Sequence, residues 1–515
     1  ENARIAWDWA AERVQVERLD QALEGLSEFY WAHWRLYEAE AACRTAASRL
    51  ASAEQLVTTA SFDKLKTSSG DGPVLPVPSE AEGSTACPER SRRAEGLRVL
   101  ARILARQADF SRETLGRAEP GNQLLRQSLA ILERPELAGQ DTRAERAFVL
   151  LQMGMIAADF DSHLEQARRL LEQSLALYQA VGDRWWASLL LNRLSQTAQH
   201  LGAQDEAKQL AEESLAIVRA LGDQTRVAES LSDLGRNALS LGHLEEAERL
   251  LRESVAIYRE TAGQGYIALG LLNAGLALCL LGKFDEAHSL LEESLAIFDD
   301  LGNRWTIAET NLRLGYTKMH LGHYEGARAQ VQASLPFLRE YGGQWGIGDS
   351  LLTLGSVALA EEAYAEAWQL LEESVAVFQE TGYRPQLGRA IAVLGYAARG
   401  LGHLDQAGLH LHKVLETAAE EGFVALLMAL PATALLLADR GQEERAVELY
   451  ALASRYRFVA NSRWFEDVAG KHIAAVAATL PPEVVAAAQQ CGRARDLEAT
   501  VAELLVELEE EPGSS

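Results

Sequence analysis

The stretch LEESLAIFDDLGNRW, from Leu291 to Trp305, returns in altered form along the chain. Residues 171–185 read LEQSLALYQAVGDRW, residues 211–225 read AEESLAIVRALGDQT, and residues 371–385 read LEESVAVFQETGYRP. The copies start 40 residues apart or at multiples of 40. A fixed period of this length is typical of repeat arrays, in which each unit is one supersecondary element.

Residues 184–423 hold six consecutive units of 40 residues. Within a unit the apolar residues follow helical spacing, which predicts amphipathic helices, and no segment alternates as a strand does. Two columns hold small residues, which predict two helices that cross closely: Gly235, Gly275, Gly315, Gly355 and Gly395, and then Ala207, Ala247, Ala287, Ala327, Ala367 and Ala407. The ends of the helices are marked as well: glycines such as Gly222 and Gly242 suit the left-handed position after a helix, and Asp183, Asp223 and Asn303 can cap the next one.

A helix pair with small residues at its crossing resembles the tetratricopeptide repeat, whose usual length is 34 residues. The 40-residue units resemble the long-helix variety in the MalT-like sensor arms of bacterial STAND proteins (signal-transduction ATPases with numerous domains). The resemblance covers about residues 145–463. It implies an all-α fold, a right-handed superhelical solenoid of antiparallel helix pairs.

These patterns divide the chain into five parts. We expect an N-terminal helical arm or cap over 1–58, a disordered insertion over 59–95, a divergent helical repeat over 96–143, the repeat array over 144–463, and capping helices with a tail over 464–515. The insertion is rich in proline and lacks a helical period. Its string STACPERSRRAEG resembles the translation of a dispersed bacterial DNA repeat, and the alternative is a docking segment around Arg90–Arg93.

The two ends of the chain carry further resemblances. The Ala-Trp-Asp-Trp run at 6–9 and the aromatic residues at 29–34 look like the segment that follows the ATPase and winged-helix modules of STAND proteins; a plain N-terminal cap with an aromatic core is the alternative. Residues 464–508 resemble the closing helices of the same regulators, with helix starts at Pro482 and near Asp496 and a helix end at Gly492. Because the chain begins with Glu1, we expect it to be part of a longer protein.

Composition excludes several classes of function. The chain has 515 residues and a formal net charge of −25, which argues against nucleic acid and anionic membranes as partners. Its four cysteines form no metal-binding or disulfide pattern, and no apolar run is long enough to span a membrane, so we expect a cytoplasmic protein. No phosphate loop or hydrolase motif is present, and His243, His323 and His403 lie too far apart to share a metal. We therefore expect neither catalysis nor a cofactor or metal.

The resemblance implies that the first helix of each unit lines the concave face of the superhelix. Carried onto this sequence, the candidate ligand-binding groove comprises Arg193, Gln196, His200, Asp233, Arg236, Asn273, Arg313, Tyr316, His320, Asp349, Arg389 and Tyr396. Some of these residues would form a basic and aromatic patch in an acidic protein. Trp185, Trp305 and Trp345 begin first helices, either as packing residues or as groove anchors. Reversing the charges of Arg193, Arg236 and Arg313 together is expected to abolish ligand binding and to leave helicity unchanged. Stability should barely respond, since exposed substitutions usually change it by about 0.5 kcal/mol or less.

The resulting hypothesis is a sensor arm. A peptide, protein or small-molecule effector would bind in the groove and control an ATPase module encoded upstream. The alternative is a constitutive scaffold that joins proteins. The sequence does not identify the ligand.

Overall fold

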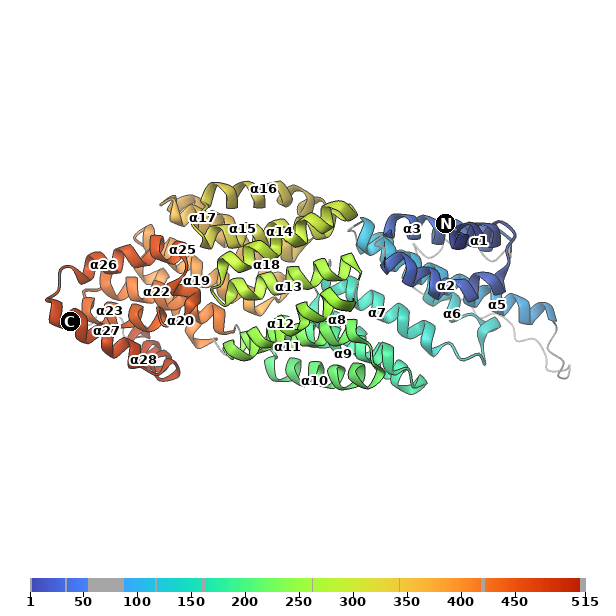
Figure 1. Ribbon diagram of the computed structural model, residues 1–515, viewed down its shortest axis with the longest axis horizontal. Helices are drawn as coiled ribbons and strands as arrows, with labels where there is room; N and C mark the ends of the chain where they lie inside the picture. The colour runs from blue at the N-terminus through green and yellow to red at the C-terminus, as the bar shows by residue number, and fades with distance from the viewer. Residues whose placement is uncertain are drawn as a thin grey trace, which may run out of the picture. The chain divides into compact units, whose positions relative to one another are not determined.

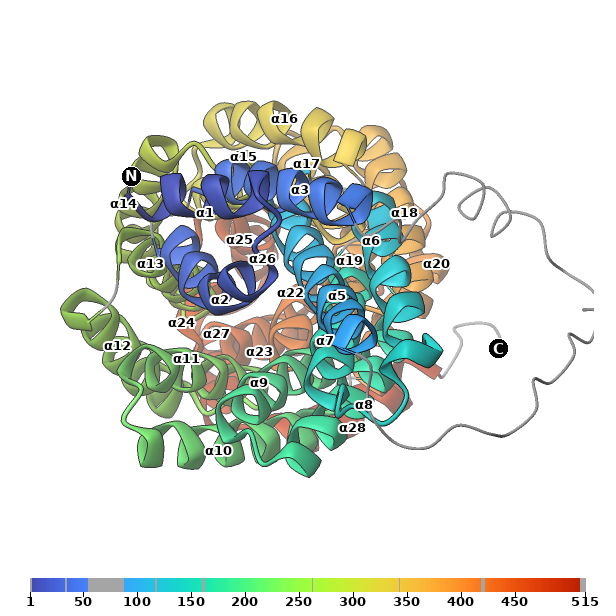
Figure 2. The ribbon, with the colours of Figure 1, turned by 90° about the vertical axis from the view of Figure 1, so that its right-hand side faces the viewer.

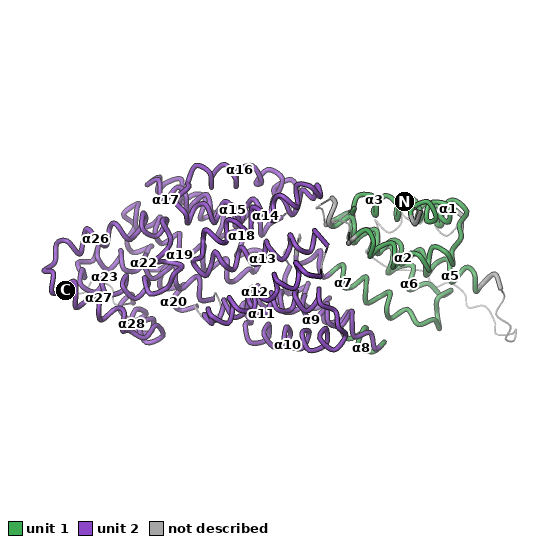
Figure 3. Tube along the Cα trace, viewed as in Figure 1, with its two compact units in different colours: residues 1–153, 176–181 green, residues 154–175, 182–515 purple. Residues whose placement is uncertain are grey.

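The computed structural model describes residues 2–32, 35–53, 88–115, 118–159, 163–261, 263–341, 343–417 and 422–509. Within these ranges the chain is helical and no strand occurs, so the predicted all-α class is confirmed (Figure 1). The chain forms two compact units (Figure 3): unit 1 comprises residues 1–153 and 176–181, and unit 2 comprises residues 154–175 and 182–515. None of the described helices is both long and apolar enough to cross a bilayer.

Unit 1 is built around a small aromatic core. Its helices are α1 (Asn2–Glu12), α2 (Val16–Ala32), α3 (Leu36–Ala53), α5 (Pro88–Leu115), α6 (Ala118–Leu132) and most of α7 (Arg143–Asp159), with a short 3₁₀ turn at Pro135–Leu137. Trp7, Tyr30 and Phe110 are buried, and the indole N–H of Trp7 donates to the carbonyl of Ala42 at 3.3 Å. The end of α8 (Leu164–Val181) also belongs to this unit.

Unit 2 contains the six predicted units as helix pairs. The first helices start every 40 residues: α9 (Arg184–His200), α11 (Gln224–Ser240), α13 (Gln264–Leu280), α15 (Arg304–His320), α17 (Gln344–Ala360) and α19 (Arg384–Gly400). The second helices are α10 (Gln204–Leu221), α12 (Leu244–Thr261), α14 (Phe284–Leu301), α16 (Tyr324–Tyr341), α18 (Tyr364–Thr381) and α20 (Leu404–Glu416). Figure 2 shows second helices such as α10 and α16 on the outside of unit 2, with α9 and α15 inside them.

Shorter helices complete unit 2. They are α22 (Phe423–Asp439), α23 (Glu443–Ala453), α24 (Arg457–Ala460), α25 (Arg463–Phe465), a π-helical turn (Glu466–Gly470), α26 (Lys471–Ala477), α27 (Pro482–Ala494) and α28 (Leu497–Glu509). The predicted start at Pro482 is confirmed, and α28 follows Asp496, whose side chain accepts from the backbone of Ala499. The predicted end at Gly492 falls two residues short of the last helical residue.

The predicted caps set the boundaries of the repeats. The side chains of Asp183, Asp223 and Asn303 each accept a hydrogen bond from a backbone N–H in the first turn of the following helix, at 3.1–3.3 Å. Gly222 has a φ of 76° and Gly242 a φ of 78°, in the left-handed region that a side chain disfavours. The sequence therefore fixes the length of each helix locally.

Two helices of one unit meet at the small-residue columns. A Cβ atom on Gly235 would lie 2.7 Å from Cγ of Leu251 and 3.3 Å from the carbonyl oxygen of Ala247. The serine of the repeated phrase completes the contact, because Ser294 donates to the carbonyl of Ala268 in the first helix of its own unit at 2.7 Å. The phrase recurs because each copy is a second helix that binds its first helix in this way.

The array winds back on itself, so that early repeats contact segments far along the chain. The Tyr383 hydroxyl donates to the carbonyl of Ala158, 225 residues away, at 2.9 Å. The indole N–H of Trp464 donates to the carbonyl of Ser356 at 2.7 Å, across 108 residues. We call this set of contacts the inter-turn seam; it comprises the pairs His200–Tyr383, Ala158–Tyr383, Gly242–Phe423, Gly282–Asn461, His320–Ser462, Tyr324–Asp467 and Ser356–Trp464.

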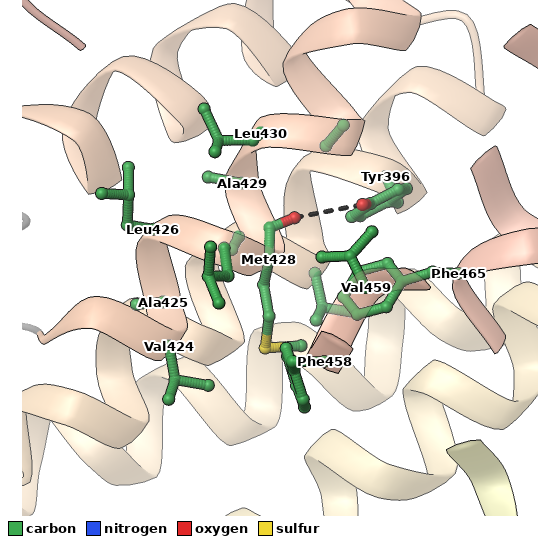
Figure 4. Packing of buried hydrophobic residues seen from close by; sticks show 14 of the residues in the cluster. Tyr396, Val424, Ala425, Leu426, Met428, Ala429, Leu430, Phe458, Val459 and Phe465 are labelled. Atoms are coloured by element: carbon green, nitrogen blue, oxygen red, sulfur yellow. Dashed lines mark hydrogen bonds between the residues drawn. The ribbon is translucent and has the colours of Figure 1, made fainter. Parts of the chain in front are cut away.

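The core of unit 2 continues through the seam into the last helices. Met428 of α22 packs among Phe458, Val459 and Phe465, and its carbonyl accepts from the hydroxyl of Tyr396 at 3.0 Å (Figure 4). All five residues are buried. Trp464, the first residue of the predicted C-terminal capping region, is fully buried as well, so this region packs into the core at its start.

One boundary differs from the expected domain division. The disordered insertion was predicted over 59–95, of which 59–87 lies outside the described residues. Residues 88–95 instead begin helix α5 at Pro88. Proline is tolerated in the first turn of a helix, where its missing N–H has no partner to lose. Ala94 of this segment is buried in unit 1.

Candidate functional site

The candidate residues lie on the first helices of unit 2, and several of their side chains form two polar clusters on the inner face. The inner face is defined here by the charged residues Arg193, Arg226, Glu229, Asp233, Arg236, Glu309, Arg313, Asp349 and Arg389. The inner face is charged, whereas the contacts between helices are apolar. Its arginines and carboxylates pair with one another, in part across neighbouring repeats.

The first cluster joins α9 to α11. Gln196 donates to both carboxylate oxygens of Asp233 at 3.2 Å, and Arg236 donates to the same carboxylate at 2.5 Å. Arg193 donates to Gln196 at 2.9 Å and pairs with Glu229 at 3.7 Å. Four of the predicted site residues are therefore brought together. Glu229 joins this group to Arg226, with which it also forms an ion pair.

Burial changes the protonation of this cluster. Desolvation raises the pKa of Asp233 to about 6, although the charge of Arg236 opposes this shift. The pKa of Glu229 is lowered, because the charges and hydrogen bonds of its arginine partners, led by Arg226, outweigh the effect of burial. The two acids therefore respond differently to pH, and Asp233 is the one that titrates just below neutrality.

The second cluster joins α15, α17 and α19. Arg313 donates to Asp349 at 2.7 Å, and Arg389 lies 3.9 Å from the other oxygen of the same carboxylate. The side chains of all three residues are at most 8% exposed. Glu309, 4.0 Å from Arg313, is more exposed and completes the cluster.

Aromatic rings support the guanidinium groups of this cluster. Arg313 lies over the ring of Trp345 at 4.1 Å, and Arg389 lies over the ring of Tyr316 at 4.8 Å. A guanidinium group over an aromatic face is attracted by the ring and keeps its edge free for hydrogen bonds. Trp185 acts similarly in the first cluster, where its indole donates at 2.9 Å to Asp223, the N-cap of helix α11, and Arg226 of the next repeat lies over its ring.

The structure places three predicted site residues elsewhere. His200, His320 and Tyr396 contact the inter-turn seam or the last helices: His200 meets Tyr383, His320 meets Ser462, and Tyr396 binds the backbone of Met428. The ends of first helices face the next turn of the superhelix, so side chains there are covered by the chain itself. Asn273 is half-buried on α13.

The expected exposure of the groove is wrong for its central residues. Arg313, Asp349, Arg389 and Asp233 are all less than 9% exposed, whereas Arg193 and Arg236 retain 31% and 24% exposure of their side chains. The expected small effect of charge reversal on stability therefore does not hold for Arg313. Its ion pair is buried, and a reversed charge would place a second carboxylate against Asp349.

Sequence reasoning missed a related cluster in unit 1. Arg102 and Arg106 of α5 both pair with Glu24 of α2, and Arg106 lies over the ring of Phe148 at 4.0 Å. Their four-residue spacing, which places both arginines on one face of helix α5, was the available signal. No group of three or more potential metal-ligating side chains gathers among the residues that the structure describes.

Comparisons with known proteins agree with this architecture. Two family models, both described as tetratricopeptide repeat, match residues 187–260 and 268–298. A search of curated protein sequences finds no match. Among solved structures, a Rap protein complexed with competence and sporulation factor is 14% identical; the match covers 78% of this chain and 97% of that one, with a TM-score of 0.53, which shows a shared fold.

Two further solved structures are similar with TM-scores below 0.5. The STAND protein with a tetratricopeptide repeat sensor from Pyrococcus horikoshii is 15% identical, with 70% of this chain and 52% of that one covered and a TM-score of 0.39. The apo form of the quorum sensor NprR from B. thuringiensis is 12% identical, with 81% and 97% covered and a TM-score of 0.42. The family models therefore show tetratricopeptide repeats within residues 187–298, and the 40-residue helix pairs and the shared fold make unit 2 a superhelix of similar helix-pair repeats.

Proposed function

We propose that unit 2 is a ligand-sensing superhelix that binds an effector peptide on its inner face. The observation that carries this proposal is the pair of arginine–carboxylate clusters on that face. Removing charged groups from water costs free energy, and replacing a buried ion pair by apolar side chains is often neutral or stabilising. A protein that only joins other proteins does not need such buried pairs. Polar groups held in fixed positions on a rigid scaffold are typical of binding sites.

The partial exposure of one cluster supports the same reading. Arg193 and Arg236 keep a quarter to a third of their side-chain surface accessible, while their carboxylate partners hold them in place. A ligand can therefore reach guanidinium groups that are already oriented, which lowers the entropy cost of binding. A protein of the same fold is complexed with a competence and sporulation factor, which makes a peptide the first effector class to test.

We further propose that the chain is the sensor arm of a bacterial, cytoplasmic STAND-type protein and has no catalytic role of its own. Residues 2–46 support this proposal through their resemblance to the segment that follows the ATPase and winged-helix modules. In this scheme, an effector on the inner face controls an ATPase module upstream. Sequencing the coding region before Glu1 tests it: a phosphate-loop ATPase followed by a winged helix is expected, and a start codon close to Glu1 would leave a scaffold.

The binding proposal is tested with a display library of random dodecapeptides. Peptides selected on the whole chain are expected to lose affinity for an Arg236→Gln variant and to keep it for Arg249→Gln. Arg249 is the matched control because it lies on the outer helix α12, paired with Glu253 at 3.3 Å and 64% exposed. Selected peptides that bind both variants as well as the native chain would move the binding surface away from the inner face and favour the scaffold.

A further inference from the structure

The inner face of unit 2 holds arginine donors that have no acceptor. The Nε atoms of Arg193, Arg236 and Arg389 are buried and make no hydrogen bond. Arg389 is 6% exposed, so this donor is removed from bulk water. A buried donor without a partner destabilises the folded state, and a ligand that supplies an acceptor would remove that cost.

The charge of the inner face points in the same direction. Five arginines face four carboxylates there, so the face is positive in a chain whose formal net charge is −25. Asp233 accepts from Gln196 and Arg236. Asp349 accepts from Arg313 through Oδ2, and its Oδ1 lies 3.9 Å from Arg389 without a hydrogen bond. An arginine has five N–H donors and an ionised carboxylate about four acceptor sites, so donors remain in excess.

The residual donors are suited to carboxylates rather than to cations. A guanidinium group presents a planar pair of N–H donors that matches a carboxylate, and charge-assisted bonds of this kind are about twice as strong as neutral ones. A cationic ligand at Asp233 or at Oδ2 of Asp349 would instead compete with Arg236 or Arg313. Displacement of either arginine would leave it unpaired.

We infer that the peptide bound by unit 2 is acidic, and that its carboxylates are held by Arg193 and Arg236 at the accessible cluster and by Arg389 at the buried one. This inference rests on the proposed function and names the ligand class for the same face. Asp233 and Asp349 act as positioning residues that hold the guanidinium groups in place. Binding occurs against the repulsion of the whole chain, so it depends on these local contacts.

The experiment uses the dodecapeptides selected on the whole chain. Each is resynthesised with its Asp and Glu changed to Asn and Gln, and both versions are measured by fluorescence anisotropy at constant ionic strength. We expect the amide versions to bind at least tenfold more weakly. We also expect Arg236→Gln to remove most of this difference, because it removes one of the groups that distinguishes a carboxylate from an amide.

The outcomes separate the ligand class from the binding function. Equal affinity of the acid and amide versions, together with a loss of binding in Arg236→Gln, would overturn the acidic class and leave inner-face binding intact. If none of the selected peptides depends on Arg236 for binding, the binding proposal itself is overturned. A third outcome is that the selection gives no acidic peptide, while calorimetry shows saturable binding of inorganic phosphate. This result would assign the donors to a small anion and overturn the peptide inference.

Discussion

The hydroxyl of Ser462 lies 2.8 Å from Nδ1 of His320, although 142 residues separate them in the sequence. Phe284 stacks on the imidazole at 4.8 Å, and Phe458 lies 5.0 Å from it. Burial lowers the pKa of His320 well below its ordinary value, and the positive charge of Arg389 adds to this effect. A neutral imidazole in an aromatic enclosure therefore joins two turns of the superhelix.

Acidification is expected to destabilise unit 2 through this histidine. The unfolded chain binds a proton at His320 below about pH 6.5, whereas the folded chain does not until a much lower pH. The contribution of His320 to the free energy of unfolding is therefore complete above pH 6.5. It falls as the pH drops, by up to ~1.4 kcal/mol per pH unit. Urea denaturation followed by circular dichroism between pH 7.5 and 5 measures this slope, and His320→Gln is expected to reduce it.

Two other groups affect the same slope and need their own variants. His200 acts in the same sense, since burial and the charges of Arg236 and Arg313 lower its pKa to about 3. Asp233 acts in the opposite sense, because its pKa is raised from 3.8 to about 6 and the folded state binds the extra proton between those values. Asp233→Asn should therefore steepen the loss of stability on acidification. An unchanged slope in His320→Gln would show that this histidine does not carry it.

The close contact at Gly282 gives a second prediction. A Cβ atom on this glycine would lie 2.3 Å from the carbonyl carbon of Arg457, and its φ is 74°. Gly302 has a similar φ of 69° and nothing within 4 Å of the same position, so Gly302→Ala measures the backbone strain alone. We expect about 1–2 kcal/mol of destabilisation for Gly302→Ala and at least ~2 kcal/mol more for Gly282→Ala, in urea denaturation. Equal losses would mean that the seam at Gly282 is not closely packed.

The local parts of the fold could be predicted from the sequence. The 40-residue period places each helix, and Asp183, Asp223 and Asn303 cap the helices as expected. These features depend on residues that are neighbours in sequence, within one unit or between adjacent units. Local spacing and propensity are enough to specify them.

The inter-turn seam could not be predicted in this way. Whether His320 faces an open groove or Ser462 depends on how far the superhelix winds per repeat, and that angle accumulates from small rotations along many repeats. A column of residues shows which face of a helix they share, and the seam and the inner face are adjacent on that face. His200 and Tyr396 were assigned to the groove for the same reason.

The helix crossing at Gly235 gives a third prediction. Gly235→Ala would push a methyl group into Leu251, with 2.7 Å between the new Cβ and Cγ, and we expect a loss of about 1–3 kcal/mol. Gly326→Ala, in helix α16 of a later repeat, is the control, because the nearest neighbour of its Cβ position is Cδ of Lys318 at 3.7 Å. That change should be neutral or stabilising by up to ~1 kcal/mol, since alanine favours helix. Thermal denaturation of both variants decides, and a neutral Gly235→Ala would show that the crossing can relax.

The inner face was predicted in position but not in environment. Arg313, Asp349 and Arg389 lie on neighbouring first helices, as the 40-residue period indicates, and all three are charged. Their burial follows from the aromatic rings of Trp345 and Tyr316, which lie under two of the guanidinium groups. The sequence shows that these aromatic residues exist, but the choice between packing and ligand contact requires the geometry.

The shared carboxylate of the second cluster gives the last prediction. Asp349→Asn keeps the shape of the side chain but leaves Arg313 and Arg389 buried without their common counter-charge. Breaking a buried pair by removing one partner costs about 3–5 kcal/mol. The outer pair Arg259–Glu293, at 2.7 Å and with both side chains nearly half exposed, is the matched control. Glu293→Gln should cost at most ~1 kcal/mol, because water screens the pair. Urea denaturation of the two variants at pH 7.5 gives both losses. Similar small losses would mean that water reaches the guanidinium groups of Arg313 and Arg389 freely. Burial would then not hold these groups in place for a ligand.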